Sequence, residues 1–124
     1  MNTILIIDDS KTVRHYHSSI IKSRGFSVIT AIDGMDGLEQ LHANKIDLVL
    51  TDINMEGMDG YEFTRRVRAV PEFENLPIVM VTTEREESDK MKGFEAGANI
   101  YMVKPADPDQ MLAQINMFLN DASS

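Results

Sequence analysis

Short apolar blocks alternate with longer amphipathic stretches along this chain. Five of the blocks have the length of a strand and are rich in β-branched residues, at Ile4–Ile7, Val28–Ile29, Leu48–Leu50, Ile78–Val81 and Ile100–Val103. Nearly continuous apolarity indicates strands that are covered on both faces, as in a parallel sheet. The pattern therefore predicts five buried parallel strands.

Each block is followed by a stretch with helical spacing of its apolar residues. The first stretch runs from Ser10 to Arg24 and stops at Gly25, a residue type that commonly ends helices. The apolar residues that mark the five stretches are Val13, Tyr16, Ile20 and Ile21; Leu38 and Leu41; Tyr61, Phe63, Val67 and Val70; Met91, Phe94 and Ala98; and Met111, Leu112, Ile115 and Leu119. Because strand-to-strand crossovers are right-handed, five βα units predict a doubly wound α/β fold with helices on both faces of one sheet.

Length and composition narrow the class of protein. With 124 residues and no linker or repeat, we expect one domain over residues 1–124, ending in a polar tail, Asn120–Ser124, with no output domain behind it if the chain is complete. The absence of cysteine excludes disulfides, thiolate metal sites and cysteine nucleophiles. No apolar run approaches the roughly 20 residues that span a bilayer, and Met1–Thr3 lacks a basic signal region, so we expect a cytoplasmic protein without a membrane partner.

The net charge of −8 argues against a nucleic-acid partner, which would need a basic face. Such acidity either serves solubility or includes acids that converge on a cation. Composition does not separate these two interpretations, but the positions of the acids do.

Polar residues stand where the predicted strands end. The residues in question are Asp8 and Asp9 after the first strand, Asp52 after the third, Thr82 and Thr83 after the fourth, and Lys104 and Pro105 after the fifth. Ligands of open parallel sheets bind outside the carboxyl ends of the strands. Three carboxylates, a hydroxyl and an ammonium group are therefore predicted to converge at one edge of the sheet.

Such a cluster favours phosphoryl chemistry. Three neighbouring carboxylates repel one another, and either proton uptake or a hard divalent cation relieves the repulsion. Two carboxylates plus waters suit Mg²⁺. Lys104 and Thr82 would stabilise the charge of a transferring phosphoryl group, and a carboxylate can itself be the nucleophile that forms an aspartyl phosphate.

At these residues the chain resembles the receiver domains of two-component response regulators, in particular the stand-alone, chemotaxis-type (CheY-like) members. The matching motifs are Ile6-Ile7-Asp8-Asp9-Ser10, Asp52-Ile53-Asn54-Met55, Met58-Asp59-Gly60, Val81-Thr82-Thr83, Gly97-Ala98 and Lys104-Pro105. They follow the family's order and spacing, and the similarity covers essentially the whole chain. The resemblance implies a flavodoxin-like (βα)5 fold with strand order 2-1-3-4-5.

The resemblance also implies a metal site and a phosphoacceptor. Asp52 would accept the phosphoryl group. Asp9, Asp52 and the backbone carbonyl of Asn54 would bind Mg²⁺ directly, while Asp8 would hold a metal-bound water.

Further residues would stabilise and report the phosphoryl group. Lys104 would pair with the phosphoryl oxygens, and the Lys104–Pro105 peptide bond would be cis. Thr82 would move to hydrogen-bond one phosphoryl oxygen, and Tyr101 would then turn inward. The face formed by the fourth helix, the fifth strand and the fifth helix would change its packing.

The implied partners are proteins. A sensor histidine kinase or a histidine phosphotransfer protein would donate the phosphoryl group, and a flagellar motor or relay component would read the result. The chain would assist its own phosphorylation and dephosphorylation without being an enzyme for an external substrate, and we expect a monomer. An intermediate phosphoryl carrier in a multistep phosphorelay is the alternative.

Two positions depart from the family pattern. Glu56 stands where proline is usual, which changes the stiffness and charge of the loop beside Asp52, and Ala106 stands where an aromatic residue commonly follows Lys-Pro. Asn54 and Glu84 occupy positions at which the family tunes the phosphoryl lifetime.

Three other classes match the sequence less well. Asp52–Gly57 resembles the start of an EF-hand loop, but its twelfth position is Phe63 and not the required glutamate. An aspartyl-nucleophile phosphatase usually carries a second acid where Asn54 stands. A dinucleotide-binding turn would need glycines in place of Asp8–Lys11.

Overall fold

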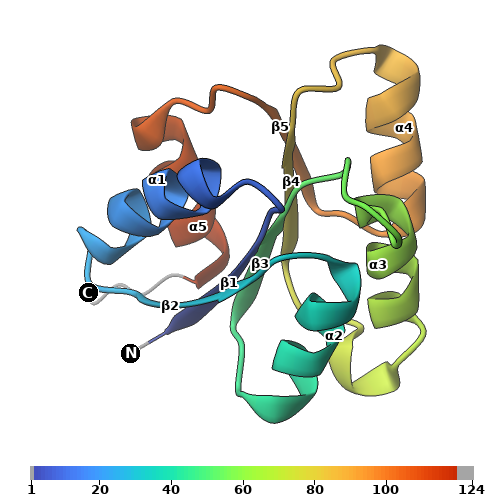
Figure 1. The fold of residues 1–124 in the computed structure, drawn as a ribbon, viewed down its shortest axis with the longest axis horizontal. Helices are drawn as coiled ribbons and strands as arrows, with labels where there is room; N and C mark the ends of the chain where they lie inside the picture. Colours follow the sequence, from blue (N-terminus) through green and yellow to red (C-terminus); the bar gives the residue numbers. More distant parts are fainter. Residues whose placement is uncertain (1, 120–124) are drawn as a thin grey trace.

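The computed structural model describes residues 2–119; Met1 and the predicted polar tail lie outside the described residues. Its strands form one parallel sheet in the order β2-β1-β3-β4-β5 (Figure 1), which confirms the predicted topology. The strands are β1 (Thr3–Ile7), β2 (Ser27–Ala31), β3 (Leu48–Thr51), β4 (Ile78–Thr82) and β5 (Ile100–Val103). The chain adds β2 on one side of β1 and then β3, β4 and β5 on the other side, so the strand order switches between β1 and β3. Ligands of such folds bind at this switch point.

Helices cover both faces of the sheet (Figure 1). One face carries α1 (Lys11–Lys22) and α5 (Pro108–Leu119), and the other carries α2 (Gly34–Ala43), α3 (Gly60–Arg68) and α4 (Glu87–Ala96). A short 3-10 helix, η1 (Pro71–Phe73), precedes β4. No helix in the described part of the chain is long and apolar enough to cross a membrane.

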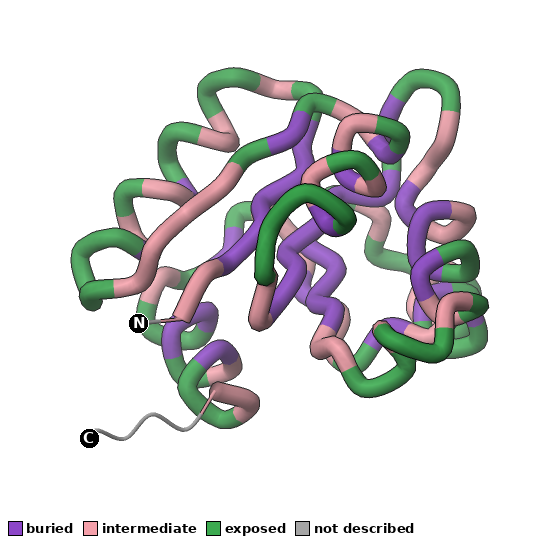
Figure 2. Tube along the Cα trace, turned by 90° about the horizontal axis from the view of Figure 1, so that it is seen from below, coloured by how far each residue is buried: buried purple, intermediate pink, exposed green. Residues whose placement is uncertain are grey.

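Alternate residues of the central strands pack to opposite sides and form two cores. Ile4 and Ile6 of β1 join the core beneath α1 and α5, whereas Leu5 and Ile7 join the core beneath α2 and α3. All four are at most 1% exposed. Figure 2 shows the buried central strands surrounded by helices in which buried residues alternate with half-buried and exposed ones. The apolar runs therefore reflect burial on both faces, as predicted.

Capping side chains fix where the helices begin on the rim of the sheet. Ser10 accepts a hydrogen bond from the Val13 amide at the start of α1, and Asp59 accepts one from the Glu62 amide at the start of α3. These bonds satisfy amides that have no partner within the helix. The helices begin close to the residues that end β1 and β3, and so their first turns surround the predicted site.

Three helix ends differ from the sequence pattern. The first helix ends at Lys22, before the predicted Arg24, because Ser23 already caps it. Val70 lies beyond α3, which ends at Arg68. Ala98 follows α4, since Gly97 ends that helix in the left-handed conformation with φ 117°.

Helix α4 packs through small residues. Met91 and Phe94, which marked this helix in the sequence, are 59% and 50% exposed, while Gly93 and Ala96 are buried. A Cβ atom on Gly93 would lie only 3.0 Å from the ring of Tyr101 and 3.0 Å from the sulfur of Met80. The glycine therefore allows α4 to approach the sheet closely enough to cover Tyr101.

Candidate functional site

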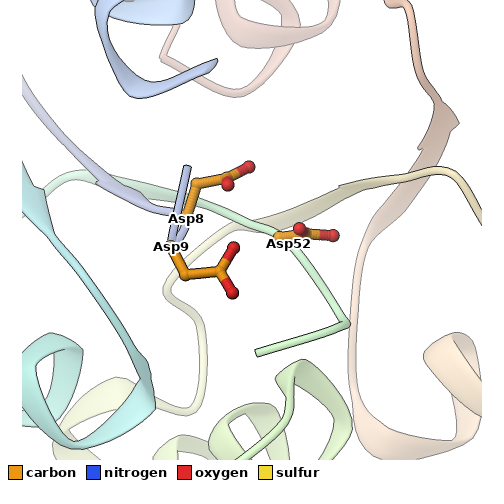
Figure 3. A group of neighbouring side chains, drawn as sticks. All are labelled: Asp8, Asp9 and Asp52. Atoms are coloured by element: carbon orange, nitrogen blue, oxygen red, sulfur yellow. The ribbon is translucent and has the colours of Figure 1, made fainter. Parts of the chain in front are cut away.

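Three carboxylates meet at the carboxyl ends of β1 and β3 (Figure 3). These strands are paired, with Ile7 opposite Thr51, so Asp8 and Asp52 are brought to the same edge. One carboxylate oxygen from each of Asp8, Asp9 and Asp52 lies within 4.8 Å of the others. Asp8 and Asp52 are buried and Asp9 is exposed, so the cluster has a closed side and an open side.

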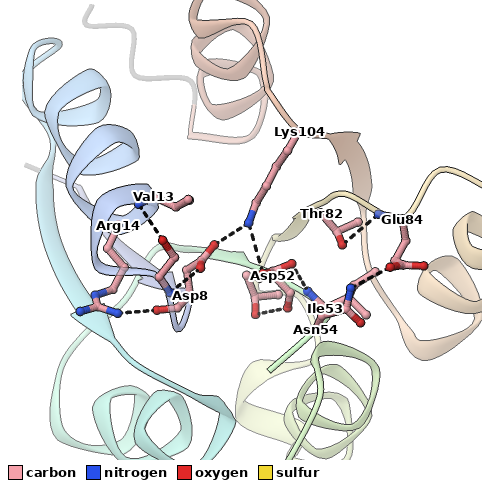
Figure 4. Close-up of polar contacts among 11 residues, drawn as sticks. Asp8, Val13, Arg14, Asp52, Ile53, Asn54, Thr82, Glu84 and Lys104 are labelled. Atoms are coloured by element: carbon pink, nitrogen blue, oxygen red, sulfur yellow. Dashed lines mark hydrogen bonds and ion pairs between the residues drawn. The ribbon is translucent and has the colours of Figure 1, made fainter. Parts of the chain in front are cut away.

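Lys104 reaches this cluster from the end of β5. Its Nζ donates to Asp8 Oδ2 at 2.8 Å and to Asp52 Oδ2 at 3.2 Å (Figure 4). Burial raises the pKa of Asp52, and although Lys104 acts to lower that pKa, the net shift is upward. Burial acts to lower the pKa of Lys104, but its bonds to Asp8 and Asp52 outweigh burial and raise it. The ammonium group therefore compensates two buried carboxylates.

Backbone groups hold the two buried carboxylates in place. The Ser10 amide donates to Asp8 Oδ1 at 2.9 Å, and the Ile53 amide donates to Asp52 Oδ1 at 2.7 Å. Gly60, the first residue of α3, donates its amide to the Ile53 carbonyl at 2.8 Å. A Cβ atom on Gly60 would collide with the carbonyl oxygen of Asp52. The loop that carries Asp52 is thus packed directly against the start of α3.

Glu84 connects the other predicted residues. Its amide donates to Thr82 Oγ1 at 3.3 Å, and its carboxylate accepts from Asn54 Nδ2 at 2.8 Å (Figure 4). Its carbonyl accepts from the hydroxyl of Tyr101 at 2.8 Å. Thr82 is fully buried and Tyr101 is half-buried. The loop between β4 and α4 therefore links Thr82 and Tyr101 through one residue.

The donor set suits a hard cation. Mg²⁺ binds oxygen ligands at about 2.0–2.1 Å and keeps several waters. Carboxylate oxygens within 4.8 Å of one another can share such an ion, and the exposed Asp9 leaves one side open to water. The cluster holds neither thiolates nor imidazoles, the ligands that favour zinc. The residues present therefore fit Mg²⁺.

Comparison with known proteins identifies the family. The family model for the response regulator receiver domain matches residues 4–116 of this chain. The chain belongs to this receiver domain family. PilH of Pseudomonas aeruginosa is 37% identical to this receiver domain over 119 residues, which cover 96% of this chain and 98% of PilH.

Two further relatives are of the chemotaxis type. The chemotaxis protein CheY of Pseudomonas aeruginosa is 39% identical over 103 residues, covering 82% of this receiver domain and 83% of CheY. The solved structure of the Vibrio cholerae chemotaxis protein CheY4 superposes with a TM-score of 0.90 at 34% identity, covering 96% of this chain and 99% of that one. These likenesses confirm the resemblance drawn from the motifs and the flavodoxin-like fold.

The receiver domain has the cis peptide bond that the resemblance implied, between Lys104 and Pro105. Receiver domains typically bind Mg²⁺ in an acidic pocket, and the group of Asp8, Asp9 and Asp52 corresponds to that pocket.

The sequence did not predict the contacts or the burial of three further residues near the site of this receiver domain, although Tyr61 was recognised as part of a helix. Arg14 donates to the Asp8 carbonyl at 2.7 Å, and Tyr61 donates to the Asp89 carbonyl at 3.1 Å. His17 is only 3% exposed, and burial lowers its pKa. The spacing could have revealed His17, because it is four residues from the buried Ile21 on the same helix. The other two contacts depend on loop conformations that spacing does not encode.

Proposed function

We propose that this chain is a phosphorylation-activated response regulator that accepts a phosphoryl group on Asp52 with the help of Mg²⁺. The observation that carries the proposal is the position of the Asp52 carboxylate. It lies 3.2 Å from the ammonium group of Lys104 and shares a potential metal site with Asp8 and Asp9. A nucleophilic carboxylate beside a cation and a metal site is the arrangement that phosphoryl transfer requires.

In the proposed reaction, an oxygen of Asp52 attacks the phosphorus of a phosphohistidine. The P–N bond breaks, its electron pair goes to the imidazole nitrogen, which takes up a proton, and an acyl phosphate remains on Asp52. Asp9, Asp52 and the backbone carbonyl of Asn54 would hold Mg²⁺ directly, and Asp8 would hold one of its waters; when bound, the ion would supply positive charge to the phosphoryl oxygens. Lys104 exchanges its bond to Asp52 for a bond to a phosphoryl oxygen.

The change is then read through Thr82. A phosphoryl dianion attracts the Thr82 hydroxyl, which at present accepts from the Glu84 amide. When Thr82 moves, the loop after β4 moves with it and shifts the Glu84 carbonyl, which accepts a hydrogen bond from the Tyr101 hydroxyl. The inward turn of Tyr101 then changes the face formed by α4, β5 and α5. The phosphoryl group on Asp52 therefore acts by stabilising an active conformation of this face relative to the resting conformation.

The proposed partners are a phosphohistidine protein as donor and a separate protein as target. Similarity to the chemotaxis proteins CheY and CheY4 supports a chemotaxis-type system, in which the donor is a sensor histidine kinase or a histidine phosphotransfer protein. The target is a motor component or, in a relay, a second phosphotransfer protein.

Intact mass measurement tests the chemistry. The protein is incubated with phosphoramidate, a small donor with the same P–N bond, with and without Mg²⁺. We expect a Mg²⁺-dependent gain of one phosphoryl group in the wild type and in the control Asp109→Asn, an exposed aspartate on α5, but none in Asp52→Asn. Equal phosphorylation of Asp52→Asn would overturn the proposal. So would the absence of any gain in the wild type with either phosphoramidate or a phosphorylated histidine phosphotransfer domain.

A further inference from the structure

Two tyrosines from different elements pack on one small cluster behind the site. Tyr61 is the second residue of α3, and Tyr101 lies in β5. Both rings lie against the buried side chains of Ile53, Met80 and Ala98. Ile53 directly follows Asp52, so this cluster begins at the residue next to the proposed phosphoacceptor.

The two hydroxyl groups bond to opposite ends of one segment. Tyr101 donates to the Glu84 carbonyl at 2.8 Å, in the loop after β4, and Tyr61 donates to the Asp89 carbonyl at 3.1 Å, in the first turn of α4. Burial raises the pKa of both hydroxyls, and each tyrosine also acts on the pKa of the other, so the two groups are electrostatic neighbours. Residues 84–89 are therefore held at both ends by tyrosines from outside the segment.

Tyr61 is joined to Asp52 without Thr82. It follows Gly60, whose amide bonds to the Ile53 carbonyl and whose Cα packs against the backbone of Asp52. The route from Asp52 through Gly60 and Tyr61 to α4 is a continuous series of covalent and hydrogen bonds. The route through Thr82, Glu84 and Tyr101 reaches the same segment from its other end.

We propose that Tyr61 is a second positioning residue of the switch, which connects Asp52 to the first turn of α4 independently of Thr82. This inference rests on the proposed phosphorylation of Asp52. It gives the hydroxyl of Tyr61 a role that packing alone does not require, since a phenylalanine ring would fill the same space. The loop and the helix then respond together, because each end of residues 84–89 is attached to the site by its own route.

Hydrogen exchange at the Asp89 and Lys90 amides reports on this turn, since both donate to the Glu86 carbonyl. Exchange is measured with Mg²⁺ before and after addition of beryllofluoride, a stable substitute for the phosphoryl group. The variants are Tyr61→Phe, Thr82→Val and the double variant, each close in volume to the residue replaced. The control is Tyr16→Phe, at a tyrosine 48% exposed on α1.

We expect both single variants to keep part of the beryllofluoride response of these two amides and the double variant to lose most of it. In the resting state, Tyr61→Phe should exchange roughly fivefold faster at these amides, as the loss of one hydrogen bond predicts. Tyr16→Phe should match the wild type. A purely structural role of Tyr61 would change resting exchange and leave the response to beryllofluoride intact.

A full response in Tyr61→Phe would overturn the inference while leaving the phosphorylation of Asp52 in place. Complete loss of the response in Thr82→Val alone would also overturn it, because a second route would then be absent. No response in the wild type, together with no mass gain from phosphoramidate, would instead contradict the proposed function.

Discussion

Lys104 lies closer to Asp8 than to Asp52. Its Nζ is 2.8 Å from Asp8 Oδ2 and 3.2 Å from Asp52 Oδ2. The side chains of both aspartates are less than 10% exposed, so neither charge is well solvated. Lys104 therefore compensates two buried carboxylates in this structure and so stabilises the fold.

Replacement of this cation should destabilise the metal-free protein. Lys104→Met leaves Asp8 and Asp52 without their counter-charge, and breaking a buried pair in this way lowers the free energy of unfolding by roughly 3 kcal/mol. Urea unfolding in the presence of a chelator measures the loss, and excess Mg²⁺ should restore part of it. Lys45→Met is the control, because Lys45 is 92% exposed and its pair with Asp47 contributes little. An equal loss of unfolding free energy in the two variants would contradict the role of Lys104 as the counter-charge of Asp8 and Asp52.

Replacement of Asp9, a proposed Mg²⁺ ligand, should affect stability in opposite directions without and with the metal. In a chelator, Asp9→Asn removes repulsion from the cluster and should unfold at an equal or higher temperature than the wild type. In excess Mg²⁺ the wild type should gain on the order of 2 kcal/mol, and the variant clearly less. Thermal unfolding under both conditions measures this, with Glu39→Gln, an exposed acid on α2, as control. A Mg²⁺ gain in Asp9→Asn as large as in the wild type would rule out Asp9 as a ligand.

Gly60→Ala should slow phosphorylation of Asp52. The added methyl group collides with the Asp52 carbonyl, so the loop that carries Asp52 must move. A small displacement of a reacting group lowers its rate by roughly tenfold or more. The initial rate of mass gain from phosphoramidate measures the effect.

Gly25→Ala is the control for this glycine. Gly25 has φ +88° and open space where a Cβ atom would lie, so alanine there costs stability through backbone strain but leaves the site unchanged. If Gly25→Ala slowed phosphorylation as much as Gly60→Ala, the rate loss would reflect general destabilisation and not the contact with Asp52.

His17 should make the protein less stable in mild acid. Burial, followed by the charge of Lys104, lowers the pKa of His17 below its usual 6.5 in the folded state. As the pH falls below about 6.5, the unfolded chain takes up the proton first, so stability present at neutral pH is lost through the folded-state pKa. The stability of His17→Leu should therefore decline less steeply between neutral and acidic pH than that of the wild type.

The control for His17 lies on the same helix. His15 is exposed, and His15→Leu should follow the pH dependence of the wild type in urea unfolding. Differences between variant and wild type isolate the histidine, because the other titrating groups are common to both. Identical pH slopes for wild type and His17→Leu would show that the imidazole does not titrate on unfolding.

The sequence predicted the central strands well, but it predicted the edge strand β2 and the inward side of α4 poorly. The central strands are buried on both faces, and their apolar runs stand out for that reason. At the edge, β2 covers Ser27–Ala31, but only Val28 and Ile29 were recognised, since Thr30 of this strand is exposed. In α4 the contacts come from Gly93 and Ala96, and the pattern of large apolar residues identifies the helix without showing which side faces inward.

The site was predictable to the extent that topology determines it. Parallel strands bring Asp8, Asp52 and Lys104 to one edge whatever the loops do, and this part of the prediction agrees with the structure. The bonds of Glu84 and Tyr61 depend on the path of the loop after β4, which no periodicity describes. The place of Thr82 at this edge followed from the end of its strand, whereas its movement and the role of Tyr101 came from family resemblance and remain predictions.

Helix α4 buries only small residues, and so it contributes less to the stability of the fold than the α-helices that bury large side chains do. Because this helix inserts only a glycine and an alanine, it can shift without withdrawing a large side chain from the interior. The energy that maintains the sheet resides mainly in the central strands and in the helices that bury Ile21, Phe63 and Ile115. If the proposed switch operates, substitutions on the outer side of α4 are therefore expected to change partner binding, or the movement of the helix, with little loss of folding stability.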